Sequence, residues 1–157
     1  MSARRFQFVF LALMGTLAVA NQLSQVSQQA AASPDGKVRV YVYRSSNVAE
    51  KEFRPSVYVD EMDVARLQEG RNVILALQSG THAFRSTDKK DQMQLDLKPG
   101  HKYYIRIDVS VVSLTGRGKL NVVLPEQGAP EFGQTKPADK SMLKNLSLIA
   151  SEFVANK

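Results

Sequence analysis

The sequence predicts an all-β fold, an antiparallel immunoglobulin-like or prealbumin-like β-sandwich of about seven to eight strands. Apolar and polar residues alternate with a period of two in a series of short segments between residues 37 and 124. Turn signals rich in glycine, proline and asparagine separate these segments. No long apolar repeat of helical period interrupts the region, which disfavours a parallel sheet built from βαβ units.

Each alternating segment places one set of apolar side chains on a single face, because alternate residues of a strand point the same way. The first segment, residues 37–44, is followed by a similar one at residues 56–60 and by others up to residue 124. We expect the core to contain Val38, Val40, Val42, Val57, Val59, Val64, Leu67, Val73, Leu75, Leu77, Met93, Leu95, Leu97, Tyr103, Ile105, Ile107, Val109, Val111, Leu120, Val122 and Leu124.

The sandwich domain is predicted to span residues 37–135 and to be followed by a C-terminal tail, residues 136–157. The stretch around Pro125 and Pro130 is typical of an irregular connection after the last strand. Pro137 can open a helix at its first turn. The tail is therefore expected to be helical and to dock on the sandwich, with a partner as the alternative target. Its apolar residues fall at helical spacings of three and four, namely Leu143, Leu146, Ile149, Ala150 and Phe153.

Residues 1–20 have the pattern of a signal peptide. Arg4 and Arg5 precede an apolar and small-residue run that ends in Ala18-Val19-Ala20. The run, residues 8–20, is shorter than the roughly 20 apolar residues of a transmembrane span, so a retained anchor is the weaker alternative. We expect cleavage, a flexible polar leader at residues 21–36, and an exported protein, periplasmic or secreted, without a transmembrane anchor.

Composition excludes several kinds of site. The sequence has no cysteine, so it has no disulfide framework, no thiolate nucleophile and no cysteine-based metal site. The net charge is +6, and it falls to +4 when residues 1–20, which carry two arginines and no acid, are removed. The basic residues are scattered singly among acids, which argues against nucleic-acid binding. A charge of this size allows weak attraction to anionic envelope polymers.

Over residues 37–135 the chain resembles the bacterial family called domain of unknown function 2846. The resemblance rests on Pro55-Ser56-Val57-Tyr58-Val59-Asp60, Ala65-Arg66-Leu67, Gly80-Thr81-His82, Leu97-Lys98-Pro99-Gly100 and Tyr103-Tyr104-Ile105-Arg106.

Residues 56–84 are also similar to the PEGA-type surface module of bacterial envelope proteins. Glu61 and Met62 stand where such modules often carry a glycine turn. Both resemblances imply an exported bacterial β-sandwich module. They bring no catalytic residues and no cofactor to this chain.

The histidines give no convincing catalytic site. A serine hydrolase needs a nucleophile, a histidine and an orienting acid, and only His82 and His101 are available, without a Gly-x-Ser-x-Gly motif. His82 has the strand parity of Phe84, which predicts a position at the margin of the core with a hydrogen bond to a turn. His101 follows a Pro-Gly turn and is expected to lie in an exposed loop.

The acidic residues give no convincing site either. Asp60, Glu61 and Asp63 do not have the ligand spacing of a calcium loop, so a solvated turn is the simpler interpretation. Glu126 and Glu131 are the candidates for the paired carboxylates of a glycosidase, whose pairing is spatial rather than sequential. We expect no catalytic residue, no metal and no cofactor.

The remaining hypothesis is a binding protein. Tyrosines and arginines have the parity opposite to the valine rows, and an exposed Tyr/Arg face favours contacts with an envelope protein or a glycan. Outward tyrosines that only stabilise the sheet are the alternative. We therefore expect a non-enzymatic binding or accessory module of the cell envelope. A structural subunit that docks on a larger assembly through its tail, and a hydrolase with a loop-built site, are the competing functions. The candidate face consists of Arg39, Tyr41, Tyr43, Tyr58, Tyr104 and Arg106.

Overall fold

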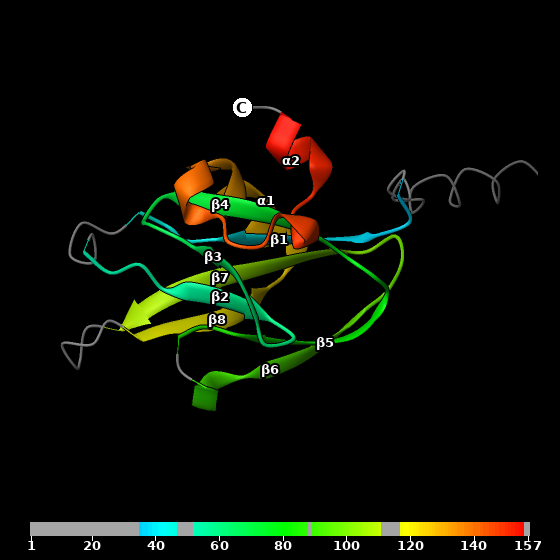
Figure 1. Ribbon diagram of the computed structural model, residues 1–157, viewed down its shortest axis with the longest axis horizontal. Helices are drawn as coiled ribbons and strands as arrows, with labels where there is room; N and C mark the ends of the chain where they lie inside the picture. Colours follow the sequence, from blue (N-terminus) through cyan, green and yellow to red (C-terminus); the bar gives the residue numbers. More distant parts are fainter. Residues whose placement is uncertain (1–34, 47–51, 88, 111–116, 156–157) are drawn as a thin grey trace, which may run out of the picture. The chain divides into compact units, whose positions relative to one another are not determined.

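The computed structural model describes residues 35–46, 52–87, 89–110 and 117–155 of the chain. This part of the protein forms two β-sheets around a shared core, with two short α-helices after the last long strand (Figure 1). The expected signal peptide, and the leader up to residue 34, lie outside the described residues. In the described part of the chain, no helix has the length and apolar character needed to cross a membrane.

The first sheet has the strand order β8-β7-β1-β4-β9. Its strands are β1 (Val38–Tyr43), β4 (Arg71–Leu77), β7 (Lys102–Ser110), β8 (Arg117–Val123) and the two-residue β9 (Lys136–Pro137). β1 runs parallel to β7, and β4 runs parallel to β9. The expectation of a purely antiparallel fold was therefore wrong for this sheet, because alternation along a strand shows which residues share a face but not which way its neighbour runs.

The second sheet has the order β3-β2-β5-β6 and is antiparallel throughout. Its strands are β2 (Ser56–Val59), β3 (Met62–Arg66), β5 (Gly80–Arg85) and β6 (Met93–Leu97), and the 3-10 helix η2 (Lys89–Asp91) lies between the last two in the chain. Asp60 and Glu61 form the tight turn between β2 and β3, with φ of 48° and 65°. Two consecutive left-handed residues are typical of a type I′ hairpin turn, here made without glycine.

The core lies between the inward rows of the two sheets, as the alternation predicts. Most residues of the predicted rows are buried in one cluster that both sheets line. Met93, Leu95 and Tyr103 are partly buried against this cluster. Val122 and Leu124 are exposed, at 52% and 74%, although they continue the row of Leu120. Val111 lies outside the described residues.

The chain after β8 differs from the sequence prediction. Residues 125–133, predicted to be irregular, form helix α1 (Pro125–Gly133) with proline in its first turn.

The tail is not one helix. It contains β9, the 3-10 helices η3 (Lys140–Met142) and η4 (Leu146–Leu148), and the five-residue helix α2 (Ser151–Ala155). The tail follows two sheet edges instead, donating from Lys144 N–H to the carbonyl of Val64 in β3 and from Ala150 N–H to that of Ile74 in β4.

The tail docks on the sandwich, as predicted, although through these edges rather than as a helix. Its apolar side chains are buried in the main core cluster, with Met142, Ile149 and Phe153 all less than a tenth exposed. Backbone hydrogen bonds to β3 and β4 replace the internal bonds that a helix would have made. The tail therefore belongs to the folded unit.

Candidate functional site

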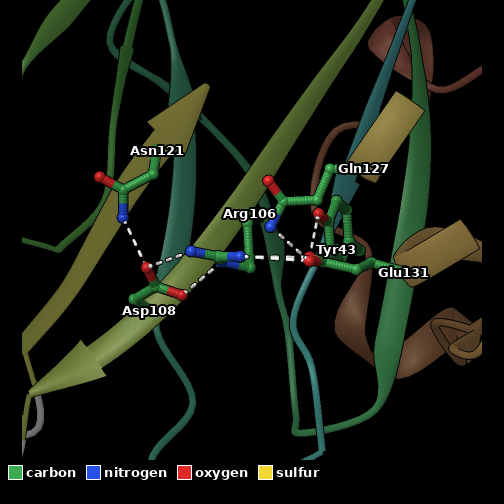
Figure 2. A network of polar contacts seen from close by, with 6 residues as sticks. All are labelled: Tyr43, Arg106, Asp108, Asn121, Gln127 and Glu131. Atoms are coloured by element: carbon green, nitrogen blue, oxygen red, sulfur yellow. Dashed lines mark hydrogen bonds and ion pairs between the residues drawn. The ribbon is translucent and has the colours of Figure 1, made fainter. Parts of the chain in front are cut away.

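A polar network of six residues lies on the outer face of the first sheet (Figure 2). The strand register determines which strand residues meet, because Arg106 of β7 lies beside Tyr43 of β1 and beside Asn121 of β8. Helix α1 then brings Gln127 and Glu131 over this row, one helical turn apart.

Glu131 is the centre of the network. Tyr43 donates its hydroxyl to Oε2 of Glu131 over 2.6 Å, and Gln127 Nε2 donates to Oε1 over 2.8 Å. Nη1 of Arg106 lies 3.3 Å from Oε2 and 3.4 Å from Oε1 of the same carboxylate. The carboxylate therefore accepts hydrogen bonds from two strands and from its own helix, and it fastens α1 to the sheet.

Arg106 links Glu131 to a second carboxylate. Its Nε donates to Oδ1 of Asp108 over 2.8 Å, and Asn121 Nδ2 donates to Oδ2 of Asp108 over 2.7 Å. Figure 2 shows the guanidinium between the two acids. Each charge of this network thus has an opposite charge or a hydrogen-bond donor beside it.

The electrostatics of the network favour a structural role over proton transfer. The hydrogen bond from Tyr43, followed by those from Gln127 and Arg106, lowers the pKa of Glu131 below its usual value despite partial burial. Burial, reinforced by the hydrogen bond to Glu131, strongly raises the pKa of the Tyr43 hydroxyl. Glu131 is therefore ionised near neutral pH, the opposite of what a general acid in a glycosidase requires. Glu126, its proposed pair, is exposed on α1.

An aromatic layer fills the space between α1 and the sheet. The rings of Tyr41 and Tyr104 stack at 4.9 Å, and the ring of Phe132 meets Tyr41 edge-on at 5.2 Å. The helix can come this close because Gly128 lies against Tyr104, where a Cβ atom would be only 2.4 Å from that of the tyrosine. Tyr43 and Tyr104 are consequently 0% and 7% exposed.

The prediction of an exposed Tyr/Arg face was therefore wrong for most of its members. Tyr43 and Tyr104 lie beneath α1, Arg39 is 8% exposed, and Tyr41 and Arg106 are half-buried. Arg39 is paired with Glu152 of α2 and with Asp35. The parity argument correctly placed these five residues on one face, but it could not show that the segment after β8 folds back over that face.

Tyr58, the sixth residue of the predicted face, lies on the second sheet. The guanidinium of Arg85 lies 3.7 Å from the centre of its ring, and Glu61 pairs with Arg85 at 2.9 Å. These contacts were missed in the sequence, where alternation alone puts Arg85 opposite to Phe84. Accessible polar or small side chains surround the pair on the outer face of this sheet, namely Asp63, Thr81, Ala83, Gln94 and Asp96.

His82 lies at the core margin and is hydrogen-bonded to a turn, as predicted. Its Nδ1 is 2.6 Å from Oδ2 of Asp60, and its Nε2 is 3.0 Å from the carbonyl oxygen of Gln78. Asp60 also accepts the N–H of Ala83 over 2.9 Å. Burial acts to raise the pKa of Asp60, but the hydrogen bonds from Ala83 and His82 outweigh it, and the pKa is lowered. The histidine therefore supports the turn and has no nearby nucleophile among its hydrogen-bond partners.

The remaining candidates are separated in space or exposed. Asp60 and Glu61 contact His82 and Arg85, and Asp63 lies 3.9 Å from Arg66, so the three acids point to different partners. Over the described ranges, no group of three or more histidines and acids could hold a metal ion. His101 is exposed, with Nδ1 3.1 Å from the carbonyl of Pro99.

Comparison with protein-family models, curated proteins and solved structures found no match to this chain. The resemblance to domain of unknown function 2846 thus stays a prediction from the motifs.

Proposed function

We propose that this chain is an exported, non-enzymatic module that binds another component of the bacterial cell envelope, a protein or a glycan, through the outer face of its second sheet. The observation that carries the proposal is the half-buried ring of Tyr58 on that face, held against the guanidinium of Arg85, which is itself only 6% exposed. Aromatic and arginine side chains are enriched where protein surfaces make strong contacts. A tyrosine offers a flat apolar ring and a polar hydroxyl to the same ligand.

The choice of this face follows from what covers the other one. α1 packs over β1 and β7, and the Glu152–Arg39 pair ties α2 to the same side of the first sheet. On the second sheet, Thr81, Gln94 and Asp96 are exposed along β5 and β6. Arg85, which is buried and paired with Glu61, holds the ring of Tyr58 in place, and this lowers the entropy that binding through Tyr58 would cost.

Binding is favoured over catalysis because the candidate catalytic groups are already engaged. Both ring nitrogens of His82 face acceptors, and the carboxylate of Glu131 accepts from Tyr43, Gln127 and Arg106. Neither arrangement leaves a base beside a nucleophile, as nucleophilic catalysis needs. A hydrolase with a loop-built site is the less favoured function for this reason.

Docking on a larger assembly through the tail has also lost support. The tail would have to leave its own core, where Met142, Ile149 and Phe153 are buried. Export rests on the features of residues 1–20 and on the two family resemblances. The two-sheet arrangement agrees with the finer assignment that we propose, an immunoglobulin-like or prealbumin-like module.

The test begins with the chain expressed from Met1 in a bacterial host. Fractionation and N-terminal sequencing would show whether it is exported and cleaved near residue 20. The purified protein is then sedimented with cell-wall sacculi and, separately, with anionic liposomes over a salt series. Tyr58→Ala is compared with Tyr41→Ala, the same change in a half-buried tyrosine of the other sheet, after urea unfolding shows that both fold.

Salt-resistant retention on one surface that Tyr58→Ala abolishes and Tyr41→Ala preserves would support the proposal. Loss of all retention at about 0.15 M salt would mean that the positive net charge explains it. Equal losses in both variants would contradict a contact through the second sheet.

A further inference from the structure

Four strand edges end the two sheets, and three of them are shielded. β9 is two residues long and contains Pro137, and backbone donors from the tail cover the edge of β3. β6 has five residues, with the charge of Asp96 on its outward face. Short length, proline, charge and covering segments are the usual protections against pairing with another chain.

β8 is the least protected edge. It has seven residues, ends the order of the first sheet, and has only β7 as a partner within the described ranges. Its C-terminal half carries the exposed apolar side chains of Val122 and Leu124. Leu124 continues the extended conformation of the strand, with φ −60° and ψ 145°, before α1 turns away. The backbone of β8 and the apolar side chains of Val122 and Leu124 thus lie along one edge, although the carbonyl of Leu124 already accepts the N–H groups of Gln127 and Gly128.

The sequence of β8 is self-complementary in one antiparallel register. A two-fold axis through Asn121, perpendicular to the sheet, puts Leu120 opposite Val122 of the second copy. It also puts Leu124 opposite Gly118, which is buried against Pro55 and Ser86. Directly opposite residues lie on the same face of a sheet, here the face that lines the core. The second copy would therefore cover the exposed side chains of Val122 and Leu124.

Charge favours the same register. Lys119 faces the outer side, where its partner in β7 is Asp108. With Asn121 at the axis, Lys119 lies opposite Val123 of the second copy, and the two lysines are about 14 Å apart along the strands. That exceeds the screening length of about 8–10 Å in physiological salt. An axis at Lys119 would instead place the two lysines directly opposite each other.

We propose that β8 is a homodimerisation edge, at which a second copy of this chain adds its own β8 antiparallel about Asn121 and continues the first sheet across the interface. The contact is isologous and therefore closes at two copies. It uses the edge of the first sheet rather than the outer face of the second, so it does not depend on the proposed function. A dimer would present two copies of that face and strengthen attachment to a repetitive polymer.

The first experiment measures the oligomeric state of the purified chain by analytical ultracentrifugation from about 1 µM to about 1 mM, the range in which an interface of this modest size is expected to associate. Val122→Lys places a charge against Leu120 of the second copy and should raise the dissociation constant at least about tenfold. Leu146→Lys is the matched control, because Leu146 is 59% exposed and belongs to the tail. Urea unfolding verifies that both variants fold.

The second experiment tests the register. The chain has no cysteine, so a single introduced cysteine reports on one position. Opposite residues at a two-fold axis have a Cα separation of about 4.5–5.5 Å, within the range that a disulfide accepts. Asn121→Cys should therefore form a disulfide-linked dimer under mild oxidation, and Lys119→Cys, about 14 Å from its symmetry mate, should not.

A dimer that Val122→Lys weakens and Leu146→Lys preserves, with crosslinking at position 121 and not at 119, would confirm the proposal. A chain that stays monomeric over the whole range would overturn it, and the edge would then be free for a strand of another protein. A dimer unaffected by Val122→Lys, or one that crosslinks equally through both positions, would also overturn it.

Discussion

Gly128→Ala tests how closely α1 must approach the first sheet. The added Cβ atom would lie 2.4 Å from Cβ and 2.6 Å from Cγ of Tyr104, whereas ordinary contacts begin near 3.4 Å. The near end of the tyrosine side chain cannot move aside, because its ring is stacked against Tyr41 and borders Phe132. The helix would therefore have to move about 1 Å away from the sheet.

The expected change in the free energy of unfolding is the loss from steric crowding minus the gain from alanine's better helix propensity. Overpacking of this kind typically destabilises a protein by about 1–3 kcal/mol, and displacement of α1 also weakens the Tyr43–Glu131 hydrogen bond, which contributes about 1 kcal/mol. Alanine regains up to about 1 kcal/mol through its better helix propensity. We expect a net loss of about 1–3 kcal/mol in the free energy of unfolding, or a fall of roughly 3–10 °C in Tm.

Urea unfolding followed by circular dichroism measures this loss. Gly133→Ala is the matched control, because it lies at the end of the same helix and its added Cβ atom would meet nothing within 4 Å. The control should be neutral or slightly stabilising. If Gly128→Ala is as stable as Gly133→Ala, the close packing of α1 on Tyr104 is wrong, and the argument that this helix covers the tyrosine face fails with it.

Four further outcomes are expected. Phe153→Ala, in the buried tail, should lower the free energy of unfolding by about 3–5 kcal/mol in urea denaturation, and a chain ending at residue 135 should not fold. Because the pKa of Tyr43 is raised in the folded state, the stability it confers is complete below its unfolded pKa near 10 and is lost as pH rises through the folded value; Tyr43→Phe should flatten this alkaline limb in unfolding curves. The pKa of Glu131 is lowered, so its contribution is present above an unfolded value near 4.5 and is lost as pH falls; Glu131→Gln should flatten the acid limb. Asp60→Ala leaves the N–H of Ala83 and the ring of His82 without their acceptor and should lower the free energy of unfolding by about 1–3 kcal/mol in urea denaturation. Asp60→Asn, which keeps one side-chain oxygen as an acceptor, should lose less.

The sequence determined the strands and the composition of most of the core. Alternation over residues 71–77 correctly predicted that Val73, Leu75 and Leu77 are buried, and the same reasoning succeeded for Val57 and Val59. This pattern is local, since a strand that packs one face on a core must place apolar residues at every second position. The position of His82 beside a turn followed from the same parity.

The candidate site was only partly predictable. Parity placed Arg39, Tyr41, Tyr43, Tyr104 and Arg106 on one face, and the structure agrees. Whether that face is open depends on residues 125–133. They form a short helix that their two prolines and two glycines did not lead us to expect. Gly128 gave no signal of its own, because its value lies in the contact it permits with Tyr104.

Tertiary structure alone decided which strands pair, which edges stay open and which faces are covered. The parallel pairing of β1 with β7, the tail along β3 and β4, and the exposure of Val122 all depend on contacts between residues far apart in the chain. A period of two records only that one side of a strand meets apolar atoms. It carries no information on which segment supplies those atoms, because many different neighbours satisfy the same hydrophobic requirement.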